Sequence, residues 1–337
     1  MPAGPDALAE RADVRADAIP PDVLASTEPL VLRGLVAHWP AVQAGQGGPL
    51  ASIDHMRRHY RDATVGAWFG PPGIQGRFFY DDTLTGFNFS AQRVRLDGVL
   101  DALARHRDDA RAPAIYVGST TVDTCLPGFR DENDVPLPGL EPLASIWIGN
   151  RTRVAAHQDL PDNLACVVAG RRRFTLFPPD EVANLYVGPL DLTPAGQPIS
   201  LVDVVKPDLA RFPRFAEAMA RARVAELQAG DAIFIPSMWW HHVEALDSVN
   251  VLLNYWWRRS PAHMDSPVHA LQMAMASVRD LPPAQRQAWR HLFEHYVFDA
   301  DDDTAAHIPP AARGSLAPLT PDAARQWRAR LLRSLNR

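Results

Sequence analysis

The residues best suited to bind a metal ion lie in two segments that are far apart in the chain. His157 and Asp159 are separated by one residue in the segment HQD. Side chains at positions i and i+2 of an extended strand point to the same face, so both can reach one ion. One imidazole and one carboxylate hold a divalent metal weakly, so we expect a third ligand from a distant strand. The segment GDAIFIPSMWWHHVEAL offers His241 or His242 for that position.

Two neutral imidazoles and one carboxylate form the facial triad of non-haem iron(II) oxygenases. This set of ligands leaves three adjacent coordination positions for a chelating cosubstrate and O2. An HxD pair alone is a weak signal, because it occurs by chance in many chains. Several other histidines lack a carboxylate or second histidine at ligand spacing on a predicted strand, and we interpret them as surface or structural residues: His38, His106, His269, His291, His295 and His307.

Short apolar runs, separated by glycine and proline, would position these ligands. Six runs between residues 114 and 257 are typical of strands: AIYVGS, ASIWIGN, NLACVV, RRFTLFP, DAIFIP and SVNVLLNYWW. Many short strands at this spacing predict a β-sandwich or barrel. The segment NLACVVAGRRRFTLF, with Gly170 between its two apolar runs, predicts a hairpin.

The regions around these strands predict loops and helices. Residues 1–24 are rich in Ala, Asp and Pro, and we expect them to be loosely held. The mixture of Gly, Pro and aromatic residues over 68–90 predicts loops that line a cleft, and a helix follows with Leu96, Val99, Leu100 and Leu103 on one face. The expected main domain is 25–260. Residues 261–337 are expected to be helical, with an acidic, proline-rich connector over 299–318, and could cover the barrel or form a homodimer interface.

Composition limits the function classes. Of the 337 residues, 47% are apolar and 22% are charged, a composition that predicts a folded chain. The net charge of −5 does not indicate a nucleic-acid or membrane-surface partner. Cys125 and Cys166 form no C-x-x-C pair, so we expect buried thiols in a reducing cytoplasm. The N-terminus lacks the apolar region of a signal peptide, and no run is long enough to span a membrane.

Residues 157–179, together with GDAIFIPSMWWHHVEAL and NYWW, resemble the jumonji-C, cupin-like hydroxylases, most closely those akin to the asparaginyl hydroxylase of hypoxia-inducible factor. The resemblance covers roughly residues 25–258. It implies a mainly β fold, a double-stranded β-helix (jelly-roll or cupin) barrel with flanking helices. It also implies Fe(II), 2-oxoglutarate and O2, and hydroxylation of an unactivated C–H bond. The substrate would be a peptide or protein side chain, or alternatively a free amino acid or small molecule. The third ligand would be His241, with His242 pointing away.

The same resemblance assigns residues to 2-oxoglutarate. Arg172 stands where the family has a lysine that binds the far carboxylate, and Lys206 is the only lysine among the 34 Lys and Arg residues of this chain. Arginine can bind a carboxylate bidentately, so the change can preserve the role. Tyr116 would also bind the far carboxylate, and Asn163 and Asn254 would flank the metal and the near carboxylate. A final set of residues is expected to wall the site or line its mouth: Trp239, Trp240, Trp256, Trp257, Asp81, Asp82, Phe87 and Asn88.

Three other classes fit the sequence less well. Cupin isomerases or dioxygenases that do not use 2-oxoglutarate commonly have His-x-His followed by Glu, and HQDLPDN has neither. A non-catalytic jumonji-like module would be expected to lack a metal ligand, whereas all three are present. A hydroxylase acting on RNA is disfavoured by the acidic balance and the single lysine.

Overall fold

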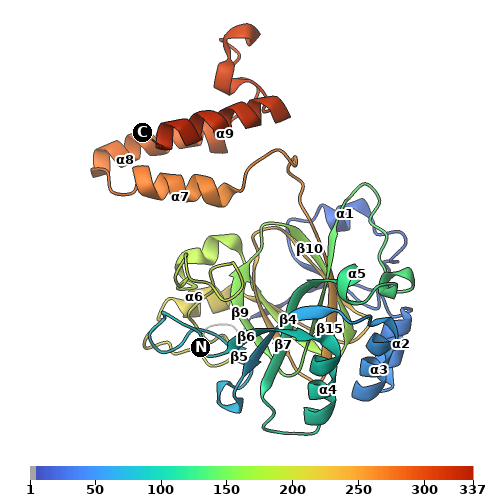
Figure 1. The fold of residues 1–337 in the computed structure, drawn as a ribbon. Coiled ribbons are helices and arrows are strands. Elements are labelled where there is room, and N and C mark those ends of the chain that lie inside the picture. The colour runs from blue at the N-terminus through green and yellow to red at the C-terminus, as the bar shows by residue number, and fades with distance from the viewer. Residues whose placement is uncertain (1–4, 337) are drawn as a thin grey trace. The chain divides into compact units, whose positions relative to one another are not determined.

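The computed structural model describes residues 5–336, which divide into two compact units, residues 5–259 and 260–336. Within the described residues, the strands of the first unit form two sheets (Figure 1). In spatial order, the six-stranded sheet contains β1 (Asp6–Ala7), β12 (Arg223–Leu227), β11 (Arg172–Phe177), β14 (Trp240–Ala245), β9 (Arg153–Gln158) and β5 (Arg77–Phe78). The nine-stranded sheet contains β2 (Ala9–Arg11), β3 (Leu30–Leu32), β13 (Ala232–Ile235), β10 (Asp162–Ala169), β15 (Asn250–Trp257), β8 (Leu143–Gly149), β7 (Ala114–Thr121), β4 (Thr64–Gly70) and β6 (Ser90–Arg95).

The sheets pack face to face as a jelly-roll, which confirms the predicted fold class. Apolar side chains from both sheets fill the space between them, including Phe174 and Val243 from one sheet and Ala165, Ile233 and Leu252 from the other. Alternation along each strand points these residues into the space between the sheets, whereas the residues between them in the nine-stranded sheet, such as Cys166, Phe234 and Leu253, are also apolar and face the other way. All six runs predicted as strands are strands in the structure, with ends that differ by one or two residues.

Helices cover the outer face of the nine-stranded sheet. The helices of the first unit are α1 (Pro21–Leu24), α2 (Pro40–Gln46), α3 (Pro49–His59), α4 (Leu96–His106), α5 (Val122–Cys125) and α6 (Phe215–Ala220). Helices α2, α3 and α4 pack on that face through one large apolar cluster (Figure 1). The buried residues of α4 are Leu96, Val99, Leu100 and Leu103, as its sequence predicted.

The predicted hairpin over residues 163–177 is wrong. Strand β10 pairs with β13 and β15, whereas β11 pairs with β12 and β14 in the other sheet. Two apolar runs joined by a short turn have the same sequence pattern in two cases: when the second strand pairs with the first in one sheet, and when the chain crosses to the other sheet. Gly170 makes this corner with a φ of +73°, a conformation that glycine adopts without strain.

Two further expectations need correction. The segment 68–90 contains more than loops, because β4 and β5 pair with neighbouring strands and β6 begins at Ser90. The first residues are not loosely held where the structure describes them. Strand β1 pairs in parallel with β12, and β2 pairs in parallel with β3, so this short segment joins the edges of both sheets. Residues 1–4 lie outside the described residues.

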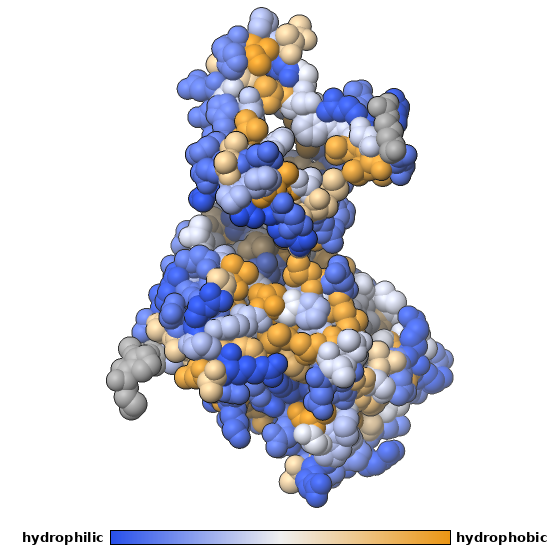
Figure 2. Space-filling model, turned by 90° about the vertical axis from the view of Figure 1, so that its left-hand side faces the viewer, coloured by the Kyte–Doolittle hydropathy of each residue, from blue (hydrophilic) through white to orange (hydrophobic). Residues whose placement is uncertain are grey.

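The second unit is helical, as its sequence predicted. It contains α7 (Pro267–Ser277), α8 (Pro283–Phe293) with a π-turn to Phe298, and α9 (Pro321–Leu335). Thr320 caps α9 by accepting a hydrogen bond from the Ala323 N–H. Among the described residues of this unit only Ala305 and Ala324 are buried, and apolar side chains reach its surface (Figure 2). Among the described residues, no helix has both the length and the apolar run needed to cross a membrane.

Candidate metal centre

Two histidines face each other across neighbouring strands of the six-stranded sheet. His157 on β9 and His241 on β14 are directly paired, and their ring centroids are 4.2 Å apart. Directly opposed residues of an antiparallel pair project to the same face. His242 is the next residue along β14, so its side chain points to the opposite face, beside Thr175 of β11. Of the two adjacent histidines, His241 is therefore the one that lies with His157 and Asp159.

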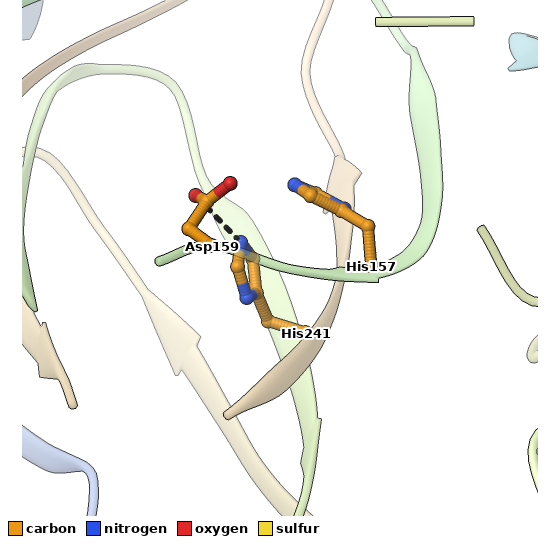
Figure 3. Close-up of side chains that lie close together, drawn as sticks. All are labelled: His157, Asp159 and His241. Carbon is orange, nitrogen blue, oxygen red and sulfur yellow. Dashed lines mark ion pairs between the residues drawn. The ribbon is translucent and has the colours of Figure 1, made fainter. Parts of the chain in front are cut away.

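Asp159 completes the set just after the end of β9 (Figure 3). Its Oδ2 atom lies 3.6 Å from Nε2 of His241, and one ligand atom from each of His157, Asp159 and His241 lies within 4.8 Å of the others. Its Oδ1 atom accepts a hydrogen bond of 3.3 Å from Nε2 of Gln197. One carboxylate oxygen is thus held by the protein, and the other faces the imidazoles.

Hydrogen bonds orient both imidazole rings. Nδ1 of His157 lies 2.9 Å from the carbonyl oxygen of Ala155, and Nδ1 of His241 lies 3.0 Å from that of Trp239. A carbonyl can only accept, so each Nδ1 donates to it, and Nε2 is the ring nitrogen left for a metal. Burial lowers the pKa of His241, and the neighbouring His157 lowers it further. The neutral form that a metal requires is therefore the favoured one.

Arg172 lines the same cavity as the two histidines. It lies on β11 in register with Ala245, four residues beyond His241 on the paired strand, which is roughly 13 Å along the strands at about 3.3 Å per residue. The side chain is 3% exposed, and it forms no ion pair or side-chain hydrogen bond with any described residue. Burial lowers the pKa of this guanidinium below its ordinary value. A buried arginine without an anion is costly, so this position is suited to bind one.

Tyr116 lies close to that guanidinium and also lines the cavity. Burial raises the pKa of Tyr116 to about 12, although the nearby Arg172 opposes the shift. The phenol is therefore neutral at physiological pH and can donate a hydrogen bond. A cation and a hydroxyl donor thus line the cavity close to each other, an arrangement suited to bind a carboxylate group.

Asn163 and Asn254 lie on the neighbouring strands β10 and β15 and contact each other directly. Nδ2 of Asn254 donates to Oδ1 of Asn163 at 3.1 Å. Oδ1 of Asn254 accepts from the indole Nε1 of Trp147 at 2.8 Å. All seven residues predicted for the site line one cavity of about 420 Å³.

The structure revises the predicted walls. Among the four tryptophans expected there, only Trp256 lines the cavity, and Trp147, Trp68 and Phe78 supply the other large walls. Trp240 packs outside the six-stranded sheet. The cavity is not lined by any of the residues expected at its mouth, which are Asp81, Asp82, Phe87 and Asn88. Asp81 instead accepts a hydrogen bond within its own turn, from the Thr83 N–H. The Asn88 amide forms hydrogen bonds with the backbone of Phe79 and Arg77.

The segment between β11 and β12 also contributes to the walls, although no pattern in its sequence predicted this role. Pro194, Ala195, Gln197 and Ile199 line the cavity. Backbone pairing holds this segment to β9, with Ile199 bridged to His157 and the Ser200 N–H donating to the Ala156 carbonyl at 2.7 Å.

A family model described as a cupin-like domain matches residues 16–263 of the 337. The chain belongs to the cupin-like, jumonji-C family. The match spans every strand of the two sheets except β1 and β2, and it includes His157, Asp159 and His241.

Several characterised members of this family are similar to the chain. "Lysine-specific demethylase JMJ31" of Arabidopsis thaliana is 34% identical over 161 residues, 45% of this chain and 28% of that protein. "HSPB1-associated protein 1" of Bos taurus is 28% identical over 276 residues, 79% and 56% of the two chains. "Bifunctional peptidase and (3S)-lysyl hydroxylase JMJD7" of Homo sapiens is 25% identical over 264 residues, 70% and 79%. The chain thus spans between 28% and 56% of the length of the first two relatives.

Proposed function

We propose that this cupin-like protein is an iron(II)- and 2-oxoglutarate-dependent oxygenase that hydroxylates an unactivated C–H bond. One observation carries the proposal. A single cavity is lined by a His-Asp-His ligand set and by a buried, unpaired arginine four residues further along the paired strands. A site for a metal alone would need only the His-Asp-His set. A site for a dicarboxylate that also chelates the metal needs the arginine as well.

The residues present fit these groups. His157, Asp159 and His241 would hold the iron, because their ligand atoms lie within 4.8 Å of one another and burial lowers the pKa of His241, which favours its neutral form. When bound, iron with 2-oxoglutarate and O2 supplies the oxidising chemistry that places one oxygen atom in a C–H bond. Arg172 and Tyr116 would bind the far carboxylate of 2-oxoglutarate. Apolar walls such as Phe174, Val243 and Leu252 exclude water from the space between.

For the substrate, we propose a side chain of a peptide or protein. The names of two relatives, a lysine-specific demethylase and a lysyl hydroxylase, refer to action on lysine residues. A free amino acid or a small molecule is the alternative. Intact-protein and peptide mass spectrometry of a cell lysate incubated with the enzyme and ¹⁸O2 separates the two, because label appears either in peptides or only in the small-molecule fraction.

The test of the activity begins with anaerobic binding. Adding Fe(II) and then 2-oxoglutarate should produce the visible charge-transfer band of a chelated 2-oxoacid. The band should be absent in His157→Ala and retained in His242→Leu, the matched control on the outer face. Under O2 the wild-type protein should form succinate. If it binds neither iron nor 2-oxoglutarate and never forms succinate, the proposal is wrong.

A different class, a metal-binding cupin that is non-catalytic or independent of 2-oxoglutarate, makes a distinct prediction. Such a protein would bind the metal with equal affinity in wild type and Arg172→Met, and 2-oxoglutarate would not compete with other ligands of the metal. The unpaired guanidinium of Arg172 counts against this class, because such a protein has no anion to place there.

We also propose that the helices of residues 260–337 form a homodimer interface. The support is the large number of exposed apolar side chains on α7, α8 and α9, among them Leu271, Trp289, Trp327, Leu331 and Leu335. Light scattering of the full chain should give twice the monomer mass, and Leu331→Glu should reduce it. A monomeric wild type at micromolar concentration would contradict this proposal.

A cytoplasmic location is proposed from the two thiols. Cys125 and Cys166 are buried and free, and burial raises the pKa of both thiols, which makes them unreactive. Fractionation of cells that produce the protein would test the location, and recovery outside the cytoplasm would contradict it.

A further inference from the structure

The indole N–H of Trp147 determines the orientation of two side-chain amides in the cavity, those of Asn254 and Asn163. Trp147 lies on β8, in register with Leu252 of β15, and its Nε1 donates to Oδ1 of Asn254 at 2.8 Å. An indole N–H can donate but cannot accept. The atom of Asn254 that faces Trp147 must therefore be the amide oxygen, and the amide nitrogen must point the other way.

The orientation of Asn254 in turn determines that of the Asn163 amide. Nδ2 of Asn254 is 3.1 Å from the Asn163 side chain, and since an amide nitrogen donates, the facing atom is Oδ1 of Asn163. The NH2 group of Asn163 is then turned away from Asn254. It has no acceptor among the described residues, and Asn163 is buried and lines the cavity. The cavity side of Asn163 is therefore a hydrogen-bond donor.

We propose that Trp147 is a positioning residue that holds Asn163 as a donor toward an oxygen atom of the bound 2-oxoglutarate. This inference rests on the proposed function. If the Asn254 amide flipped, its NH2 group would oppose the indole N–H, and its oxygen would oppose the oxygen of Asn163. Both hydrogen bonds would be lost in a buried place, where unpaired polar groups are costly. The chain of three side chains thus has one favoured orientation.

Trp256 provides a matched control. It lines the same cavity, and its ring centroid lies 5.6 Å from that of Trp147. Its Nε1 is buried and has no partner among the described residues. Replacing either tryptophan by phenylalanine removes a similar volume from one wall, but only Trp147→Phe removes a hydrogen bond.

The experiment measures binding to the full chain by anaerobic calorimetry. The dissociation constant for Mn(II) alone is measured first, and that for 2-oxoglutarate is measured with Mn(II) present. Trp147→Phe should weaken 2-oxoglutarate binding about 5- to 20-fold, the effect of one or two hydrogen bonds, and should leave Mn(II) binding unchanged. Trp256→Phe should weaken 2-oxoglutarate binding much less. If the two variants weaken it equally, the positioning role is wrong.

A double-mutant cycle separates positioning from a general packing effect. In an Asn163→Ala background, Trp147→Phe should cause no further loss of 2-oxoglutarate binding, because the donor that Trp147 orients is gone. Additive losses would overturn the proposal. If Trp147→Phe does not fold, Trp147→benzothienylalanine keeps the ring shape without the N–H and gives the same comparison. A wild type that binds Mn(II) but not 2-oxoglutarate would overturn the proposed function and this inference with it. A wild type that binds both, with equal losses in the two phenylalanine variants, would overturn the inference alone.

Discussion

Replacing Arg172 with methionine should change stability and cosubstrate binding in opposite directions. The guanidinium is buried, and no described carboxylate pairs with it. In the ligand-free protein this charge lowers stability, because it has left water without gaining an ion pair. Methionine is shorter than arginine, but it is flexible, has a similar volume and carries no charge. The ligand-free variant should therefore be more stable than the wild type, and it should lack the group that binds the far carboxylate.

The expected sizes follow from the burial of this one charge. Replacing buried ionic groups with apolar ones of similar volume often stabilises a fold by about 1–4 kcal/mol. For a unit of this size that corresponds to a rise in Tm of roughly 2–10 °C. Removing one partner of a buried charge pair costs about 2–5 kcal/mol of binding, so the dissociation constant for 2-oxoglutarate should rise at least ~30-fold.

The assay compares thermal unfolding with and without 2-oxoglutarate and Mn(II), under anaerobic conditions. The matched control is Arg173→Met on the same strand. That side chain faces outward, is half-exposed, and pairs with Glu226 at 3.2 Å, so its removal should change stability by less than ~1 kcal/mol and leave binding unaltered. A lower Tm for ligand-free Arg172→Met, or undiminished 2-oxoglutarate binding, would refute the reasoning.

Three further predictions rest on single contacts. Gln197→Leu removes the hydrogen bond to Oδ1 of Asp159 and should weaken metal binding about 10- to 100-fold, as measured by chelator competition; an unchanged affinity would mean that the bond has no orienting role. The pKa of Tyr116 is raised to about 12 in the folded state, so the folded protein keeps a proton that the unfolded chain loses above pH 10. The free energy of unfolding should therefore fall as the pH rises from 10 to 12. In the metal-free protein this fall should be ~2–3 kcal/mol smaller for Tyr116→Phe than for the wild type. Identical pH profiles of the two proteins in denaturant unfolding would contradict this. Gly170→Ala should destabilise the fold by about 1–3 kcal/mol or more, because φ is +73° and a Cβ would lie 2.4 Å from a side-chain oxygen. The control is Gly98→Ala in α4, where a Cβ meets no atom within 4 Å and should stabilise the fold by up to ~1 kcal/mol. Equal changes in the two unfolding curves would argue against backbone strain at Gly170.

The sequence pointed to His157, Asp159 and His241, which the structure brings together, because the chemistry of such a ligand set is local. His157 and Asp159 share one face through simple alternation, and the third ligand could be narrowed to two adjacent histidines. Strand pairing then decides between those two, since His241 opposes His157 and His242 opposes Thr175 on the other side. The six apolar runs also predicted their strands, because continuous apolar segments of that length are buried in sheets.

Features that depend on long-range pairing could not be predicted. A turn at Gly170 is compatible with a hairpin or with a crossing between sheets, and only the partners of β10 and β11 distinguish the two. Gln197 lies in an irregular segment whose sequence has no periodic pattern, yet bridging of Ile199 to His157 brings it to the metal centre. Trp147 looked like one more apolar strand residue, because its hydrogen bond to Asn254 joins residues 107 apart.

The short segment that joins the edges of both sheets also has a consequence for synthesis on the ribosome. Strand β1 contains Asp6 and Ala7, but its partner β12 starts at Arg223. At about 5–20 residues per second, the ribosome takes roughly 10–40 s to add the residues between them. Throughout that interval β1 has no partner, and the edge of the six-stranded sheet forms only at the end. Exposed strand edges can pair with other chains. The nascent protein is therefore expected to depend most on chaperones before residue 227 has left the exit tunnel, and to need them less once β1 has paired.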